Sequence, residues 1–574
     1  MQYSGKVCCN GSYLDAQRRK IVDNTLSMKI DGALFERIIE SGARNLKLNL
    51  QIVNDLNVFP VPDGDTGDNM YMTIQGGLKG LRAVSENSIE KKAKALADGM
   101  LMNARGNSGV ILSQLFAGIS DGLAGREEAS VVEIGNAFHS GVCKAYKAVS
   151  NPVEGTILTV AREATAYACE NCDGSCTIGR FFENYTTEMK ASLDRTPELL
   201  AVLKEAGVTD SGGAGLVYIA EGMKSAVEGK EVEAVEEPVG QVNEIDFSLF
   251  NENSVMDYGY CTELLLQLTN AKGDVSSFDL EALKSFLESV GDSVVCFITG
   301  SVVKLHIHTL TPDKVLAYCL KYGEFLTVKI ENMSIQHSEV KKQEKPAIKK
   351  SKPRTKFGLV TVATGEGLIN VFKELGADEV IDGGQGKNPS IERFIEAFDD
   401  VNADTIFVLP NNSNIVMAAK QAGELYDKSQ IVVIETKDIG QAYNVLSMLD
   451  YSSEDVDVIA GQMRNDMKEV VTGMVTTSIR DANIDGIDIK NGDYIGFAGK
   501  TMLTANKDKI ESFFALADKL DAWDKNFMIV SFGENVTEEE KQAVEDRISN
   551  EHPMLEFYRI DGGQEVYDFI MILE

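Results

Sequence analysis

The sequence lacks features that mark three large classes of protein. No run of about 18 apolar residues occurs, so we expect no membrane-spanning helix. The polar first 27 residues lack the apolar core of a secretion signal, which predicts a cytoplasmic protein. Basic residues are scarce: 56 Lys and Arg face 88 Asp and Glu, for a net charge of −32. Such a surface argues against nonspecific binding to nucleic acid or anionic lipid.

Cysteine is also scarce. The nine cysteines are odd in number and scattered over 574 residues, which predicts reduced thiols rather than a disulfide framework. Cys169, Cys172 and Cys176 cluster with a C-x₂-C spacing that zinc and iron–sulfur sites use. Because no fourth ligand follows nearby, we favour incidental reduced thiols there.

The length exceeds what one compact core supports, so several domains are expected. Apolar residues such as Phe35, Ile38 and Leu46 recur at helical spacing from residue 28 onward, which predicts one long helix leading to residue 56. From 357, short apolar runs alternate with helical ones, which predicts a mostly parallel sheet. The predicted parts are an N-terminal extension 1–27, an all-α domain 28–227, a linker 228–247, a small α/β middle domain 248–336, a basic linker 337–356 and an α/β domain 357–574.

The segment NVFPVPDGDTGDNM, residues 57–70, carries three aspartates between prolines and glycines. Pro60 and Pro62 stiffen the approach, and Gly64 and Gly67 allow a tight bend. Such a loop can aim carboxylates at one point, and carboxylates are ligands for Mg²⁺ or Ca²⁺. Taken alone, the Asp-Gly-Asp motif favours an Asp-Gly turn with solvated side chains, and the neighbouring motifs change this balance.

Three further loops each open a predicted helix. They are NARGNSGVILSQ at 103–114, NPVEGTILTV at 151–160 and AGVTDSGGAGL at 206–216. Free backbone N–H groups and the helix dipole favour phosphate at such positions, although ordinary helix capping explains each loop separately. Gathered at one end of a helical bundle, the four loops predict a site for a nucleotide with Mg²⁺.

In this order and spacing the four loops resemble the nucleotide-binding domain of the dihydroxyacetone kinase family, known as the Dak2 or DhaL-type domain. The wording LNVFPVPDGDTG is similar to the fatty acid kinase branch. The segments EVIDGGQGKNPS and FVLPNNSNI resemble the DegV-like C-terminal domain of that branch. The resemblance, over roughly residues 28–574, implies an all-α helical barrel that binds ATP with two Mg²⁺ ions.

The resemblance also implies roles for individual residues. Asp63 and Asp65 match the catalytic metal aspartates, and a third family aspartate falls near Asn57, a further candidate magnesium ligand. Asp68 departs from the usual Thr, and it either joins the metal shell or points away. The residues implied to lie at the nucleotide are Thr66, Gly67, Asp68, Asn69, Met70, Asn107, Ser108, Gly109, Gly155, Thr156, Arg195, Thr196, Asp210, Ser211 and Gly212.

The middle domain holds a candidate zinc site. His306 and His308 alternate along a predicted strand and so share one face, and Cys261 stands on another strand. Two imidazoles and a thiolate suit a structural Zn²⁺, with His337 as a candidate fourth ligand. From the residues alone, core histidines and a buried thiol are as good an explanation, and the resemblance favours zinc.

In the last domain, the loops 383–390 and 409–415 follow strands, where α/β folds keep their sites. Gly386, Lys387 and Ser413 depart from the family wording, so contacts with a carrier protein are expected to differ there.

The leading hypothesis is an ATP-dependent fatty acid kinase subunit. It would phosphorylate a fatty acid presented by a separate DegV-like fatty-acid-binding protein, giving acyl phosphate and ADP, and the resemblance implies a homodimer. Two rivals are a small-polyol kinase of the dihydroxyacetone type and a non-catalytic lipid-binding or scaffold protein.

Overall fold

A computed structural model describes residues 26–56, 64–173, 175–230, 260–332 (except 271, 273, 274, 276, 277 and 300) and 354–574. The chain divides into two compact units. One unit is the segment Glu236–Lys350, and the other combines the two flanking segments, Met1–Val235 and Ser351–Glu574. The helical domain and the C-terminal α/β domain therefore form one unit, although the middle domain separates them in sequence.

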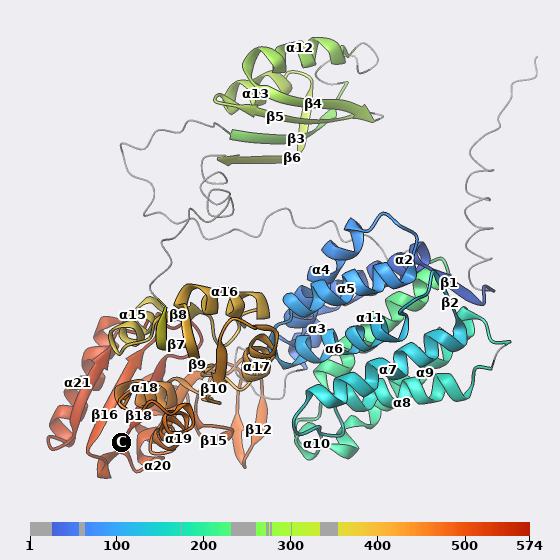
Figure 1. Ribbon diagram of the computed structural model, residues 1–574. Helices are drawn as coiled ribbons and strands as arrows, with labels where there is room; N and C mark the ends of the chain where they lie inside the picture. The colour runs from blue at the N-terminus through green and yellow to red at the C-terminus, as the bar shows by residue number, and fades with distance from the viewer. Residues whose placement is uncertain are drawn as a thin grey trace, which may run out of the picture. The chain divides into compact units, whose positions relative to one another are not determined.

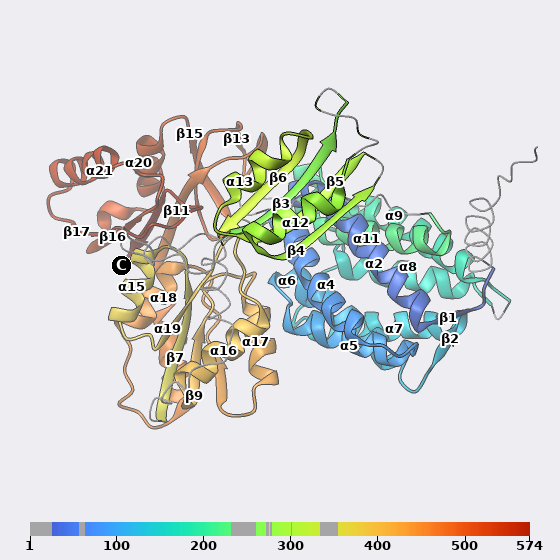
Figure 2. The same ribbon diagram turned by 90° about the horizontal axis from the view of Figure 1, so that it is seen from above.

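The helical domain confirms the predicted all-α class, with one short two-stranded ribbon at its edge (Figures 1 and 2). The predicted helix from residue 28 is divided at Asn49, which has φ −108° and ψ 13°. The elements are β1 (Lys29–Asp31), α2 (Gly32–Leu48), α3 (Leu50–Asp55), α4 (Thr66–Ala83), α5 (Ile89–Met102), α6 (Gly106–Gly122), β2 (Glu128–Ser130), α7 (Val131–Ala148), α8 (Ile157–Glu170), α9 (Ile178–Leu199), α10 (Ala201–Ala206) and α11 (Ser211–Val227).

Close helix contacts in this domain depend on glycine. A Cβ atom on Gly99 of α5 would lie 2.6 Å from the carbonyl oxygen of Gly76 of α4. The two helices approach to backbone contact there, which no larger residue allows.

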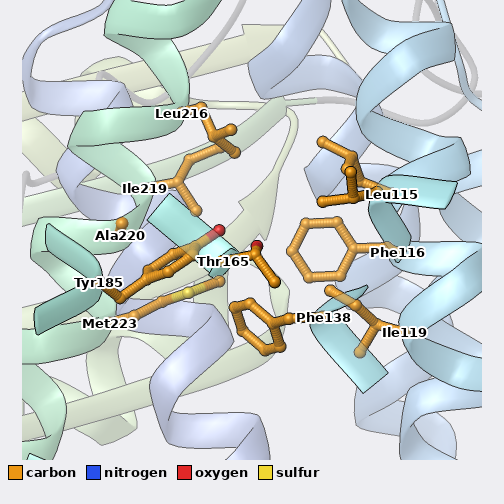
Figure 3. A pocket seen from close by; sticks show the side chains of 11 residues that line it. Leu115, Phe116, Ile119, Phe138, Thr165, Tyr185, Leu216, Ile219, Ala220 and Met223 are labelled. Atoms are coloured by element: carbon orange, nitrogen blue, oxygen red, sulfur yellow. The ribbon is translucent and has the colours of Figure 1, made fainter. Parts of the chain in front are cut away.

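The interior of the helical domain is apolar and almost filled. A cavity of about 30 Å³ lies between side chains of α6, α7, α8, α9 and α11 (Figure 3). Phe116, Phe138 and Met223 converge on it, and none of its lining side chains is charged. A space of this size holds about one water molecule, so the region is core.

The C-terminal domain contains two large sheets (Figure 1) and the small antiparallel pair β12–β13. The first has the order β10-β9-β7-β8 and is parallel throughout, as predicted. The second has the order β15-β14-β11-β18-β16-β17, and only the β16–β17 pair is parallel. The prediction of a mostly parallel sheet is therefore wrong for this half, where a tight turn after Ala498 joins β14 to β15 as a hairpin.

The elements of this domain are β7 (Thr355–Ala363), α15 (Glu366–Glu374), β8 (Glu379–Asp382), α16 (Ile391–Val401), β9 (Ala403–Leu409), α17 (Val416–Leu425), β10 (Gln430–Val433), α18 (Ile439–Ser447), α19 (Val456–Asp466), β11 (Val471–Thr477), β12 (Ala482–Ile484), β13 (Ile487–Ile489), β14 (Tyr494–Ala498), β15 (Thr501–Asn506), α20 (Lys509–Lys519), η3 (Ala522–Asp524), β16 (Phe527–Phe532), α21 (Glu538–Glu551), β17 (Glu556–Ile560) and β18 (Phe569–Leu573).

The helical and C-terminal domains share a buried interface. Helix α16 packs against α5, and α17 packs against α6. Ala104 and Val110 of the helical domain belong to the same buried apolar cluster as Phe394 and Ile415 of the C-terminal domain. A continuous core explains why the two domains form one unit.

The middle domain is a small α/β unit, as predicted. Its antiparallel sheet has the order β4-β5-β3-β6, and its buried leucines pack with Leu283 and Leu287 of α12. The elements are β3 (Tyr260–Leu268), α12 (Leu280–Val290), β4 (Asp292–Thr299), β5 (Val302–Thr309), α13 (Pro312–Cys319) and β6 (Gly323–Asn332).

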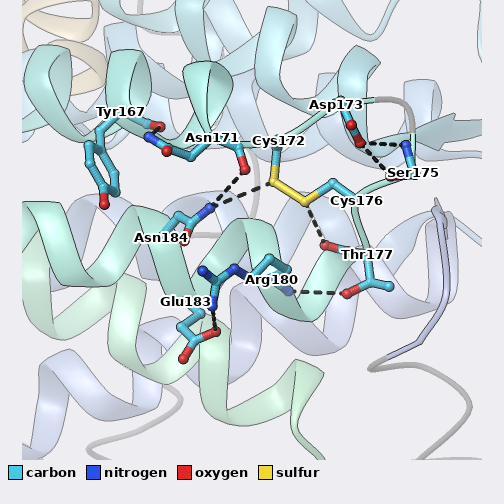
Figure 4. Close-up of a disulfide and its surroundings, with 10 residues drawn as sticks. All are labelled: Tyr167, Asn171, Cys172, Asp173, Ser175, Cys176, Thr177, Arg180, Glu183 and Asn184. Carbon is cyan, nitrogen blue, oxygen red and sulfur yellow. Dashed lines mark hydrogen bonds and ion pairs between the residues drawn. A yellow bond between two sulfur atoms is a disulfide. The ribbon is translucent and has the colours of Figure 1, made fainter.

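Cys172 and Cys176 form a disulfide in the turn between α8 and α9 (Figure 4). The prediction of reduced thiols is wrong for this pair, because the turn brings their Cα atoms to 5.1 Å, within bridging range. Cys169 keeps a free thiol, as do Cys143 and Cys319. Among the residues that the structure describes, no group of three or more His, Cys, Asp or Glu side chains could hold a metal ion.

Across the same described ranges, no helix is both long and apolar enough to cross a bilayer.

Candidate nucleotide site

A pocket of about 290 Å³ lies where the loops of the helical domain meet the C-terminal domain. Most of its polar lining comes from residues that the sequence singled out. The lining residues that the sequence predicted for the nucleotide site are Asp65, Thr66, Asn69, Asn107, Ser108, Thr156, Asp210, Ser211 and Gly212.

Four helices begin at this pocket. Thr66 is the first residue of α4, Asn107 and Ser108 lie in the first turn of α6, Ile157 is the first residue of α8, and Ser211 is the first residue of α11. Each helix N-terminus carries free N–H groups and a partial positive charge. Their convergence makes the pocket favourable for an anion such as phosphate.

Among the described residues that line the pocket, Asp65 and Asp210 are the two acidic ones, and none is Lys, Arg or His. Asp65 immediately precedes α4, and its side chain makes no capping hydrogen bond to that helix. A nucleotide polyphosphate beside two carboxylates needs a cation to offset the repulsion. Carboxylate and amide oxygens are the ligands that Mg²⁺ prefers, so the residues present fit a magnesium–nucleotide complex.

Asp210 caps α11 from its pocket position. Its Oδ2 accepts a hydrogen bond from the backbone N–H of Gly213 at 2.7 Å. Burial nevertheless raises the pKa of this carboxyl group to about 6. The preceding loop is held by Thr196, whose Oγ1 accepts a hydrogen bond from the N–H of Asp210 at 3.2 Å.

The start of α6 is shaped by Gly106, which has φ +57°. A Cβ atom there would lie 2.7 Å from Nδ2 of Asn69 and 3.3 Å from Nδ2 of Asn388. Only glycine combines this backbone conformation with so close an approach. Gly106 therefore brings the α6 N-terminus against the α4 loop and against the C-terminal domain.

Arg105, directly before α6, is a partly buried cation. Its Nε is buried without a hydrogen-bond partner, and its guanidinium forms no ion pair with any residue in the described ranges. Burial lowers its pKa. Placing an unpaired charge out of water is costly, so an anion bound at the adjoining α6 N-terminus would stabilise Arg105, although Arg105 itself is not among the lining residues.

Two predicted phosphate contacts are engaged elsewhere. The N–H of Gly67 donates to Oδ1 of Asn54 at 2.7 Å, so it is not free for phosphate. The exposed Asp68 accepts from Nδ2 of the same Asn54 at 2.7 Å and does not line the pocket. Of the two alternatives for Asp68, the structure therefore favours the one in which it points away from the pocket.

Other predicted residues support the site from outside the pocket. Met70 is fully buried in the helical core, and Gly109 packs against Thr73. Gly155, with φ +83°, donates its N–H to Oγ1 of Thr159 at 2.8 Å.

Arg195 is held away from the pocket by ion pairs with Glu163 at 2.7 Å and Glu188 at 2.5 Å. Since its charge is already balanced, a role as a nucleotide ligand has no support from this geometry.

Some functional candidates were missed by the sequence reasoning. Asn414 and Met417 of the C-terminal domain line the pocket, and Asn151 and Val153 do so from the helical domain. Asn414 belongs to the loop 409–415, which the sequence marked as a site, although for carrier contacts. Its position after a strand was the available signal, but nothing local showed that it faces another domain.

Several predicted metal ligands lie outside the described residues, so their roles stay predictions. They are Asp63 and Asn57 in the aspartate loop and His337 after β6. In the middle domain, the strand register pairs Cys261 with His308, and His306 with Glu263. The side chains of Cys261, His306 and His308 also lie outside the described set, and the zinc site remains a prediction.

Comparison with protein families matches three separate segments of the chain. Residues 60–225 match the DAK2 domain, residues 257–340 the middle domain of FakA-like fatty acid kinase proteins, and residues 358–574 the C-terminal domain of the same proteins. Among solved structures, DegV from Bacillus subtilis, described as a fatty acid binding protein, is 13% identical. The match covers 38% of this chain and 99% of that one, with a TM-score of 0.30.

Full-length relatives give the stronger comparison. Protein YloV of Bacillus subtilis is 39% identical over 95% of this chain and 99% of its own length. An uncharacterized protein of Staphylococcus aureus strain USA300 is 36% identical over 95% of this chain and 100% of its own length. With all three domain matches in the same chain, the protein belongs to the FakA-like family of fatty acid kinase proteins.

Proposed function

We propose that this chain is the ATP-dependent kinase component of a two-component fatty acid kinase. It transfers the γ-phosphoryl group of ATP to the carboxylate of a fatty acid, giving acyl phosphate and ADP. The observation that carries the proposal is the pocket at which α4, α6, α8 and α11 begin beside Asp65 and Asp210. This arrangement combines sites for phosphate oxygens with ligands for the accompanying cations.

The protein's own groups position and neutralise the phosphates. Residues at the first turns of α6 and α11 line the pocket, where backbone N–H groups of a helix N-terminus can donate to phosphate oxygens, while Ser108 and Ser211 add hydroxyl donors. Asp65, with Asp63 as its predicted neighbour in the loop, would hold two Mg²⁺ ions. Bound magnesium would neutralise charge on the transferred phosphoryl group.

The acceptor needs little activation. A fatty acid carboxylate is ionised at neutral pH, so its oxygen can attack phosphorus without losing a proton. The new O–P bond forms as the bond from the γ-phosphorus to the bridging oxygen breaks, and ADP leaves with that electron pair. The described residues that line the pocket include no histidine, which agrees with a reaction that needs no strong general base.

The proposal includes a partner and an assembly. A DegV-like fatty-acid-binding protein would present the acyl chain, the kinase component would act as a homodimer in the cytoplasm, and the middle domain would carry a structural zinc. Family membership supports the partner, and the other assignments extend the sequence predictions.

The test is capture of acyl phosphate as hydroxamate. The purified chain is mixed with ATP, Mg²⁺ and a fatty acid, with and without a DegV-like protein from the same genome. Product that requires the carrier supports the proposal. Binding of ATP without product on any carrier would contradict it and direct attention to a polyol acceptor such as dihydroxyacetone.

A matched pair of variants tests the site. We expect D65N to lower the rate by at least about 100-fold, because it removes a charge that acts at the phosphates. D68N changes an aspartate three residues away that is exposed and bonded to Asn54, so it should keep most of the activity. Equal losses in the two variants would contradict the assignment of Asp65.

A further inference from the structure

The loops of the C-terminal domain reach the nucleotide site of the helical domain. Nδ2 of Asn388 donates to Oδ2 of Asp65 at 2.5 Å. Nδ2 of Asn107 donates to Oδ1 of Asn414 at 3.3 Å, and Met417 lines the same pocket. Two loops that follow strands of one domain therefore meet the predicted metal and phosphate ends of a site in the other.

Asn388 is deeply placed in this contact. Its side chain is 3% exposed, and its Oδ1 has no hydrogen-bond partner. The backbone beside it is fixed to the helical domain by a hydrogen bond from the N–H of Ile391 to the carbonyl oxygen of Ala104 at 3.3 Å. Asn388 thus lies between Asp65, to which it donates, and the α6 N-terminus, where Gly106 leaves room for its side chain.

Asp65 depends on such a contact for its orientation. It precedes α4 without capping that helix through its side chain. A hydrogen bond to a carboxylate is about twice as strong as one between neutral groups, and here the donor is buried. Loss of the donor would remove this bond and weaken the hold on the carboxylate in the geometry that a metal ion requires.

We propose that Asn388 is a positioning residue for Asp65, so that the C-terminal domain completes the magnesium–nucleotide site of the helical domain. The inference rests on the proposed nucleotide-binding function and deepens it. The C-terminal domain is then part of the kinase centre as well as a surface for partners.

A simpler role must be distinguished from this one. Asn388 could act only by holding the two domains together. Gln421 provides the matched control, because its Oε1 accepts a hydrogen bond from Nε2 of Gln114 across the same interface at 2.9 Å without touching Asp65. Any general weakening of the interface should appear in Q421A as well as in N388A.

The experiment measures Mg²⁺-dependent binding of a fluorescent ATP analogue to the full-length chain. For N388A we expect the Mg²⁺ concentration that gives half-maximal binding to rise about tenfold, the effect of losing a hydrogen bond to a charged group. For Q421A we expect no more than about a twofold change. Equal shifts in the two variants, or no shift in N388A, would overturn the proposal.

The variant N388D gives a second readout that a purely structural role would not move. The new carboxyl group can donate to Asp65 only when it is protonated, and otherwise it repels Asp65. We expect its binding defect to exceed that of N388A at about pH 8 and to shrink at about pH 6. If the binding defect of N388D did not depend on pH, that result would count against the proposal. This test with N388D remains decisive even if N388A fails to fold.

These outcomes are separable from a failure of the proposed function, because no acyl acceptor is present. A chain that binds the Mg²⁺–nucleotide complex but forms no acyl phosphate would overturn the kinase assignment and leave the role of Asn388 intact. A chain without Mg²⁺-dependent nucleotide binding would overturn both.

Discussion

Asp210 accepts a hydrogen bond from the backbone N–H of Gly213 at 2.7 Å, and the same carboxyl group lines the nucleotide pocket. One side chain thus caps α11 and faces the ligand. Its charge is costly to the protein without ligand, since burial raises its pKa to about 6. Retention of a group that destabilises the unliganded fold agrees with a role in binding.

The first prediction concerns the pH dependence of stability. The folded-state pKa of Asp210 lies above the ordinary aspartate value near 4, so its contribution to stability is fully present below that value and is lost as pH rises through 6. D210N keeps an oxygen that can cap α11 but carries no charge. We expect D210N to exceed the wild-type chain in free energy of unfolding by about 1–2 kcal/mol at pH 8, after allowance for solvent in the pocket.

Urea unfolding at about pH 4.5 and pH 8 measures this difference. The gap between the two chains should be small at the lower pH and should widen at the higher pH. A gap of constant size would show that the buried charge of Asp210 is not its source.

The second prediction concerns Arg105, whose guanidinium has no partner in the described ranges. R105M removes an unpaired buried charge and keeps much of the side-chain volume. We expect the free energy of unfolding without ligand to rise by about 1–2 kcal/mol, while affinity for the Mg²⁺–ATP complex falls at least about tenfold.

Urea unfolding measures the change in stability of R105M, and titration with the fluorescent ATP analogue measures its change in nucleotide affinity. R82M is the control, since Arg82 is an exposed residue paired with Glu40 at 2.7 Å, and it should leave nucleotide affinity unchanged. If R105M bound nucleotide as the wild type does, Arg105 would have no role at the phosphates.

The third prediction compares two helical glycines. In G99A, the added methyl would meet the backbone oxygen of Gly76 at 2.6 Å, so α4 and α5 would have to separate. In G461A on α19, nothing lies within 4 Å of the new methyl. We expect G99A to lower the free energy of unfolding by about 1–3 kcal/mol and G461A to raise it by about 0.5–1 kcal/mol.

Chemical denaturation of both variants checks the pair. The changes in free energy of unfolding of G99A and G461A should have opposite signs. A stabilising effect of G99A would show that α4 and α5 are not in backbone contact.

The fourth prediction concerns the disulfide between Cys172 and Cys176. Because the bridge closes a loop of only a few residues, we expect its loss to lower the free energy of unfolding by at most about 2 kcal/mol. Unfolding with and without reductant measures the effect, and C172S should be insensitive to reductant. Alkylation of the denatured chain should label two more thiols after reduction than before it, and an unchanged count would exclude the bridge.

Much of the architecture could be predicted because it is encoded locally. The apolar runs 357–363 and 404–409 are strands, and the stripe containing Phe35, Ile38 and Leu46 is buried, as their spacing indicates. The antiparallel direction of the second sheet was not predicted, because a buried strand has the same apolar sequence pattern whether its neighbours run parallel or antiparallel. Strand direction depends on the connections, and the hairpin between β14 and β15 gave only a weak signal.

The candidate site was predicted in part for the same reason. Ser108 and Asp210 stand at helix starts that the sequence marks, and both line the pocket. Arg195 was placed near the nucleotide, but its partners Glu163 and Glu188 are brought to it by the fold. Asn388 lies in the loop 383–390 that the sequence marks as a site, but its contact with Asp65 could not be predicted, because it spans 323 residues of sequence.

That separation has a consequence for how the protein is made. During synthesis Asp65 is added to the chain 323 residues before Asn388, a delay of about 16–65 s at about 5–20 residues per second. Domains generally fold in the order of their translation, so the whole helical domain is synthesised while the residue proposed to orient Asp65 does not yet exist. A growing or truncated chain would therefore hold ATP less firmly than the finished one, and translation to the end of the C-terminal domain would itself switch the kinase centre on.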